Sequence, residues 1–514
     1  MEDRKRMLVM LWQSHLPILE RIRDRLDVDL EIFKPSRYYD TGMDMSEVVS
    51  MMRGWDATIV YMQNSQFCSD MEAAVLPIKD SMRIIGFGND PSKWTLTTVD
   101  HGLAIRVFEY MQESGDENFV RMFDALEKGF GWKDGDPLPP VKVPWQGVVD
   151  PVSGTVYDST DQYIRSCDID SSKPFVGIIA SRPMFFMDGL RIERELCSDL
   201  FGLDINPVLV FVSFSKKPDF GAISHGEAIR EYFMKDGRPI VDAMVKLSTG
   251  FIGSSMTCDP QDPDSMELLR EINVPIYQPV VMARFSEEEW RESIGLTSDI
   301  TWQVAFPEFE GIIEPVVIGS DIGHIRGEDK ERVSIESRRR MFAGRLSKMV
   351  RLRRKPNHEK KAVIFLNNYP CNGVEANVGN AAGLDTLESV VGIMKRMKKE
   401  GYVVDPPSDG KELISRILDS KALSEFRWTT ALEMKKHGGV IHEMGLPEYE
   451  AYFSMLSDKT RNDVISTWGV PPGEGMVLGG NILITGVPFG NVIVAVQPKR
   501  GCFGTRCDGQ VCKI

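Results

Sequence analysis

The first 130 residues alternate short apolar runs with longer stretches whose apolar residues repeat at helical spacing. Met7–Trp12 and Ala57–Tyr61 are β-rich runs, whereas Pro17–Leu26 repeats its apolar residues with the period of a helix. The remaining runs indicate strands at 28–33 and 82–87 and helices at 45–52, 70–78, 102–112 and 117–129. Strands separated by helices of this length predict right-handed βαβ units around a parallel sheet.

The alternation of predicted strands and helices continues after Gly135–Pro151, a stretch rich in proline and glycine that marks a domain boundary. The pattern predicts a domain at 1–135, a linker at 136–152, a second α/β domain at 153–330 and a third part at 331–514. The third part contains an α/β segment at 360–420 and strands at 481–500. Since 514 residues are too many for one hydrophobic core, we expect an α/β fold with several Rossmann-like or flavodoxin-like parallel-sheet units in a multidomain chain.

The stretch Lys360–Tyr402 predicts a strand, a loop rich in glycine and asparagine, and a helix. Ala362–Leu366 is the β-rich run. The helical pattern runs through Leu387, Val390, Val391, Ile393, Met394 and Met397. In an open α/β sheet such a loop follows the carboxyl end of a strand, where ligands usually bind.

Composition and charge exclude several classes of partner. The net charge of −14 argues against nucleic acid, because phosphate binding needs a surplus of lysine and arginine. No apolar run reaches the roughly 18–20 residues that cross a bilayer, and the N-terminus lacks the apolar core of a signal peptide, so we expect no membrane partner and a cytoplasmic location. The sequence has no P-loop, GxSxG or HExxH motif, so ATP is not expected to bind here.

The Lys360–Tyr402 stretch, the segment Thr301–Gly319 and the segments Ser466–Gly475 and Gly490–Gly501 resemble one family. They are similar to the large subunits of the ATP-dependent tetrapyrrole chelatases, namely the cobaltochelatase subunit CobN and the magnesium chelatase H subunit. The resemblance begins near Pro174 and is strongest towards the C-terminus. It implies a subunit that holds a tetrapyrrole substrate for insertion of Co²⁺, or alternatively Mg²⁺, while separate AAA+ motor and adaptor subunits use ATP.

Part of the family pattern is absent. The family's Gly-x-His-Gly motif, which is followed by a Glu and by Leu-Pro-Gly-Lys, does not occur, and family members are usually more than twice this length. We therefore expect the N-terminal half of a large subunit, from a cut, split or truncated gene product, that is inactive alone. The resemblance implies cobalt insertion into a corrin precursor in cobalamin biosynthesis. The alternatives are a magnesium chelatase H subunit acting on protoporphyrin IX and a non-catalytic tetrapyrrole-binding or scaffold protein.

The candidate substrate-binding residues lie after two predicted strands. Asn377, Asn380 and Asp385 belong to a loop before a helix, whose free N–H groups can hold a tetrapyrrole carboxylate. The alternative is a tight turn that needs glycine for its backbone conformation. Gln497 and Arg500 follow the second strand, where Arg500 could pair with a substrate carboxylate. The alternative for these two is a solvated strand end.

Glu308, Glu310 and Glu314 lie beside apolar, strand-like residues in the segment Thr301–Gly319. A buried carboxylate with a raised pKa can accept protons from pyrrole nitrogens as the metal enters. Glu308 is therefore the candidate catalytic base. The alternative is an edge-strand turn fixed by a proline and a glycine.

Cys502, Cys507 and Cys512 are candidate metal ligands, although zinc and iron–sulfur sites usually have four ligands and the common family pattern lacks these thiols. The histidines form no motif, and His225 could cap a helix or face a cleft. The basic helix Arg338–Arg354 is expected to be a solvated face packed on neighbouring domains, or else a contact for an acidic motor partner.

Overall fold

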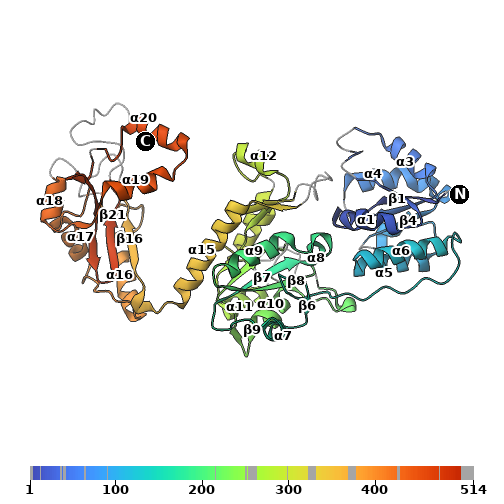
Figure 1. Ribbon diagram of the computed structural model, residues 1–514, viewed down its shortest axis with the longest axis horizontal. Helices are drawn as coiled ribbons and strands as arrows, with labels where there is room; N and C mark the ends of the chain where they lie inside the picture. The colour runs from blue at the N-terminus through green and yellow to red at the C-terminus, as the bar shows by residue number, and fades with distance from the viewer. Residues whose placement is uncertain are drawn as a thin grey trace. The chain divides into compact units, whose positions relative to one another are not determined.

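The structure is a computed structural model in which the chain forms two compact units, Met1–Arg351 and Leu352–Ile514 (Figure 1). It describes residues 4–498 apart from 12, 35–36, 39–41, 63–64, 89–90, 215, 249–251, 253–262, 298, 322–331, 369–377, 425–428 and 474. Within these residues, no helix has both the length and the apolar character needed to cross a membrane.

The first sheet is parallel, with the strand order β2-β1-β3-β4. Its strands are β1 (Arg6–Met10), β2 (Asp29–Ile32), β3 (Ala57–Tyr61) and β4 (Ile84–Phe87). The helices around it are α1 (Leu16–Ile22), α3 (Met45–Gly54), α4 (Gln66–Val75), α5 (His101–Glu113) and α6 (Asp116–Gly129). Successive residues of β1 face opposite sides, so Met7 and Val9 pack with α1, α5 and α6, whereas Leu8 and Met10 pack with α3 and α4. The βαβ pattern predicted for the first 130 residues is confirmed.

The second sheet is mixed, with the strand order β12-β11-β7-β8-β5-β6. Its strands are β5 (Gly147–Val149), β6 (Val156–Tyr157), β7 (Phe175–Ser181), β8 (Asn206–Val212), β11 (Ala243–Lys246) and β12 (Ile276–Tyr277). The strands β7, β8, β11 and β12 are parallel, whereas β5 runs antiparallel to β8 and to β6. Because β5 lies within 136–152, the end of the stretch interpreted as a linker belongs to this sheet.

Helices cover both faces of the second sheet. The helices α9 (Arg191–Phe201) and α15 (Glu336–Arg354) pack on one face, and α7 (Thr160–Ser166), α10 (His225–Phe233) and α11 (Pro263–Ile272) pack on the other. Phe342, Leu346 and Val350 of α15 reach the core. Its Arg339 is also buried and pairs with Asp199 and Glu195, both at 2.7 Å. Most of the basic helix therefore packs within the first unit.

A third sheet in the first unit has the order β13-β14-β15. Its strands are β13 (Val280–Met282), β14 (Val317–Ser320) and β15 (Val333–Ser334). The expectation of strand-like structure from Thr301 onward is wrong up to Phe309, because Thr301–Ala305 is a π-helix and α13 (Phe306–Phe309) is a short α-helix. Trp302 and Phe306 pack edge-to-face with ring centroids 5.0 Å apart, a contact that helical spacing allows.

The second unit contains two small sheets, with the orders β16-β21-β20 and β17-β19-β18. Their strands are β16 (Ala362–Leu366), β17 (Val440–Met444), β18 (Val477–Leu478), β19 (Asn481–Thr485), β20 (Val487–Phe489) and β21 (Val492–Val496). The helices include α16 (Thr386–Lys399), α17 (Gly410–Asp419), α18 (Ala431–Lys436), α19 (Leu446–Ser454) and α20 (Asp458–Trp468). Val390, Val391 and Met394 of α16 are buried against β16 and β21, so the strand and helix predicted within Lys360–Tyr402 are confirmed.

Candidate functional site

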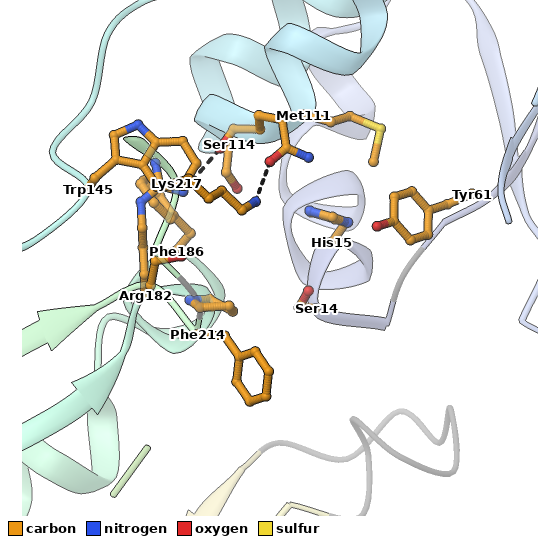
Figure 2. A pocket seen from close by; sticks show the side chains of 13 residues that line it. Ser14, His15, Tyr61, Met111, Ser114, Trp145, Arg182, Phe186, Phe214 and Lys217 are labelled. Carbon is orange, nitrogen blue, oxygen red and sulfur yellow. Dashed lines mark hydrogen bonds between the residues drawn. The ribbon is translucent and has the colours of Figure 1, made fainter. Parts of the chain in front are cut away.

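A cavity of about 210 Å³ lies in the first unit, at the carboxyl ends of strands from both large sheets (Figure 2). The part of the chain that forms the first sheet contributes Ser14, His15, Tyr61, Met111, Gln112 and Ser114. The part that follows contributes Trp145, Arg182, Pro183, Phe186, Ser213, Phe214 and Lys217. His15 follows β1, Tyr61 ends β3, Arg182 follows β7 and Ser213 follows β8. Carboxyl ends of parallel strands are the usual ligand-binding edge of α/β sheets.

Arg182 forms one wall of this cavity and is only 6% exposed. Its Nε, Nη1 and Nη2 atoms donate to the carbonyl oxygens of Pro144, Gln112 and Glu113 at 3.1, 3.1 and 2.6 Å. The guanidinium also lies over the Trp145 ring, 3.9 Å from its centroid. Burial lowers the pKa of Arg182 to about 10, against the opposing effect of the Glu113 carboxylate, so the group stays charged at neutral pH.

Lys217 brings a second cation to the same wall. Its Nζ atom donates to Oε1 of Gln112 at 2.5 Å and lies 5.3 Å from the centroid of the Trp145 ring. Burial, and then the nearby Arg182, lower the pKa of Lys217 to about 8, so the amine is mostly protonated at pH 7. Among the residues that the structure describes, neither Arg182 nor Lys217 forms an ion pair.

Other polar and aromatic groups complete the lining. Figure 2 shows His15 and Tyr61 on the side of the cavity away from Trp145. His15 packs on Phe119 with ring centroids 5.3 Å apart, and burial raises the pKa of Tyr61, so its hydroxyl stays neutral. Phe186, on the short helix α8 (Arg182–Asp188), places its ring centroid 4.8 Å from the Arg182 guanidinium.

These groups suit a ligand that carries an anionic group on a flat, unsaturated framework. Cations attract carboxylates, and aromatic faces pack on flat apolar surfaces. Sites for drug-sized ligands measure roughly 300–1,000 Å³, so about 210 Å³ admits part of a large ring and not the whole. This cavity was not predicted from the sequence, because its residues come from well-separated segments. The available signal was the set of polar or charged residues that directly follow strands, such as Arg182 and Ser213.

A second polar cluster is buried at the carboxyl end of β11. Lys246 is 1% exposed, and its Nζ atom donates to Oε1 of Gln278 at 3.2 Å. Nε2 of His225 lies 2.9 Å from Oγ of Ser248. Burial lowers the pKa of Lys246 to about 8, against the opposing effect of Glu310. Burial, and then Lys246, lower the pKa of His225 to about 3, so this ring is neutral at pH 7.

The three glutamates of the predicted base segment have different surroundings. Glu308 is exposed on α13, so the expectation that it is a buried carboxylate is wrong, because the segment is helical there and turns this residue outward. Glu310 accepts a hydrogen bond from the Ile252 backbone N–H at 2.7 Å. Glu314 pairs with Arg345 at 3.0 Å. The segment therefore acts on the buried Lys246 cluster through Glu310.

In the second unit, β16 and β21 run parallel and end side by side. The backbone N–H of Gln497, just after β21, donates to the carbonyl of Leu366 at 2.9 Å. The side chain of Asn367 donates to the carbonyl of Asn380 at 3.2 Å. Gln497 and Asn380, two of the predicted substrate-binding residues, thus lie around the carboxyl ends of this strand pair.

Asp385 is the N-cap of α16, and its carboxylate accepts from the Glu388 backbone N–H at 3.1 Å. Gly379 and Gly383 have positive φ angles of 74° and 71°, as the tight-turn alternative requires. The predicted site residues Asn377, Arg500, Cys502, Cys507 and Cys512 lie outside the described residues. Within the described part of the chain, no group of three or more histidine, cysteine, aspartate or glutamate side chains is placed to hold a metal ion.

The sheets with parallel strands and the cavity at their carboxyl ends define a multidomain α/β protein. A sequence profile of the CobN/Magnesium Chelatase family matches residues 108–512, which is well over half of the chain. The chain therefore belongs to the CobN/Magnesium Chelatase family.

Three known proteins illustrate the relationship. Protein MJ1441 of Methanocaldococcus jannaschii is 33% identical over 98% of this chain and 40% of its own length. The chloroplastic magnesium-chelatase subunit ChlH of Oryza sativa subsp. indica is 26% identical over 76% of this chain and 27% of its own length. The solved catalytic subunit of cobaltochelatase from Mycobacterium tuberculosis superposes with a TM-score of 0.63 at 20% identity, over 97% of this chain and 39% of that one.

The structural match confirms the predicted fold class, a mixed α/β fold with several sheets that contain parallel strands. The chain spans between about a quarter and two fifths of the length of these three proteins. Family membership and fold are therefore established for the chain.

Proposed function

We propose that the chain is a tetrapyrrole-binding part of the large subunit of a metal chelatase. The observation that carries this proposal is the family match over residues 108–512. We favour insertion of Co²⁺ into a corrin precursor, as in cobalamin biosynthesis, with the metal ion as a substrate. ATP is used by separate AAA+ motor and adaptor subunits, and the complex works in the cytoplasm. The similarity to ChlH supports the alternative, Mg²⁺ insertion into protoporphyrin IX.

The proposed roles follow from charge and position. A tetrapyrrole gives up inner N–H protons as a divalent cation enters, so a base must accept them. The exposed Glu308 carboxylate is available to a ring that approaches from solvent. Asn380 and Gln497 at the β16–β21 edge, with Asn377, Asp385 and Arg500, are proposed to hold the ring substituents. Cys502, Cys507 and Cys512 are proposed to be ligands of a metal ion.

A calorimetric titration of the 514-residue chain with hydrogenobyrinic acid diamide, and separately with protoporphyrin IX, tests the proposal. We expect one molecule of ring to bind per chain. Binding of the corrin precursor at least tenfold tighter than protoporphyrin IX supports the cobalt assignment, and the opposite order supports magnesium. The proposal fails if neither ring binds.

A further inference from the structure

The cavity described above contains none of the residues to which the proposed function assigns a role. Its wall carries Arg182 and Lys217, which both contact the Trp145 ring, at 3.9 and 5.3 Å from the centroid, and both donate to Gln112, Arg182 to its carbonyl and Lys217 to its side chain. Two like charges in a partly buried place repel, and water screens them poorly there. Within the described residues no carboxylate pairs with either cation, and the nearby Glu113 carboxylate instead binds Lys142 at 2.6 Å. An anionic ligand would relieve this repulsion.

The two cations have different freedom to meet such a ligand. Each nitrogen of the Arg182 guanidinium already donates to a backbone carbonyl, and each Nη atom keeps only one further N–H, so Arg182 is fixed in the wall and does not present an open fork to an oxyanion. Lys217 Nζ has three N–H donors and uses one on Gln112. The remaining donors belong to an ammonium that lines the cavity. Lys217 is therefore the group that can take the anion directly.

The surroundings favour a carboxylate over a phosphate. Phosphate sites usually offer several convergent donors, such as a bidentate arginine or a row of backbone N–H groups. Here one ammonium is free to donate, and beside it lie the aromatic faces of Trp145 and Phe186. A singly charged carboxylate on an unsaturated ring matches that combination. The volume of about 210 Å³ suits one ring and its acidic arm.

We propose that this cavity is a binding site for one carboxylate arm and the adjoining pyrrole ring of a tetrapyrrole, with Lys217 holding the carboxylate and Trp145 and Phe186 packing on the ring. The identity of the ring rests on the proposed function, whereas the carboxylate rests on the cavity alone. In this arrangement the first unit binds one edge of the macrocycle, and the remainder of the macrocycle stays outside the cavity.

The test uses the full chain and a small probe, dimethylpyrrole propionate, which is a single pyrrole ring with one propionate arm. Binding is followed by saturation-transfer NMR, with ethyl-dimethylpyrrole as the ring without a carboxylate and inorganic phosphate as the other anion. We expect Lys217→Gln to weaken propionate binding roughly 10- to 100-fold, because a charge-assisted hydrogen bond is lost. Lys217→Arg should retain part of the affinity.

Lys216→Gln is the matched control. Lys216 is adjacent in sequence, but it is exposed, pairs with Glu227 and does not line the cavity. This variant should bind the probe as the wild type does. If Lys217→Gln does not fold, acylation of Lys217 in the wild-type chain replaces it, and the probe should then protect that amine in a peptide map while Lys216 reacts equally with and without the probe.

The inference is overturned if Lys217→Gln and Lys216→Gln bind the probe equally, if the carboxylate-free ring or phosphate binds as tightly as the propionate, or if the probe gives Lys217 no protection. Failure of this site and failure of the proposed function give different results. If complete tetrapyrroles bind the wild type and Lys217→Gln equally and the probe does not bind, only the inference fails. If the probe binds through Lys217 but neither complete ring binds, the proposed function fails and the identity of the ring with it, whereas the carboxylate site at Lys217 stands.

Discussion

Replacing Arg332 by methionine should destabilise the first unit by roughly 3–5 kcal/mol, the usual effect of removing one partner of a buried ion pair. The two guanidinium Nη atoms donate to the Glu193 carboxylate at 2.6 and 2.8 Å, and Nη1 also lies 3.2 Å from Asp188. Glu193 is 0% exposed. Burial disfavours the charged guanidinium, but the two carboxylates outweigh it and raise the pKa of Arg332. In the variant, Glu193 is left as a buried carboxylate without its cation.

The assay must isolate this region, because a chain with two compact units has no single unfolding midpoint that reports on one of them. Urea-dependent amide hydrogen exchange in α9, which carries Glu193, gives the local free energy of opening. Arg230→Met is the control: its pair with Glu271, at 3.3 Å, is exposed, and the expected loss is below about 1 kcal/mol.

The double variant Arg332→Met with Glu193→Leu should recover most of the lost stability, because no buried charge then remains at Glu193. Asp188 keeps acceptor bonds from the backbone N–H groups of Leu190 and Arg191 at 3.0 and 3.3 Å. A loss below about 1 kcal/mol in the single variant would refute the reasoning. So would a double variant that is as unstable as the single one.

Three further predictions concern titration, capping and catalysis. His225 has a folded-state pKa of about 3 and an ordinary pKa of 6.5, so the unfolded chain binds more protons between these values and stability is lost as the pH falls through that window. Between pH 7 and pH 4 the region around α10 should lose up to roughly 3 kcal/mol by hydrogen exchange, with the neighbouring Lys246 charged throughout, and His225→Asn should remove this loss. Asp385→Ala should destabilise α16 by about 1 kcal/mol in urea-dependent hydrogen exchange, whereas Asp385→Ser should keep the helix cap. If the Asp385 carboxylate contacts the substrate, both variants should also bind the ring more weakly. Glu308→Gln in the complete enzyme should lower the rate of metal insertion at least tenfold without changing ring affinity, and unchanged turnover would exclude Glu308 as the base.

Much of the fold was predictable, because the hydrophobic period reports directly on the face that an element buries. In β1, Met7 and Val9 face one core and Leu8 and Met10 the other, so the unbroken apolar run that predicted this strand is explained by burial of both its faces. The prediction of strand-like structure from Thr301 was wrong for a related reason. Its Trp, Val and Phe residues favour a strand by composition, but contacts at helical spacing, such as Trp302 with Phe306, favour the helix.

The candidate site was less predictable, because it depends on which strand ends meet in space. The residues after β16 and after β21 could be proposed as candidates because each strand is followed by polar residues, and the structure brings Gln497 beside Leu366. The cavity wall with Arg182 and Lys217 could not be proposed. Both cations contact Trp145, which belongs to a proline-rich stretch that predicts a linker. The burial of Lys246 could likewise not be predicted, because a lysine at a strand end normally reaches solvent.

Equilibrium dialysis of the purified chain against hydrogenobyrinic acid diamide and protoporphyrin IX tests the central claim most directly, because it measures bound ring without relying on any one residue as a reporter. The proposed function predicts saturable binding of at least one of the two rings, with one molecule per chain at saturation. Retention of neither ring above the level of an unrelated protein of similar charge would contradict it.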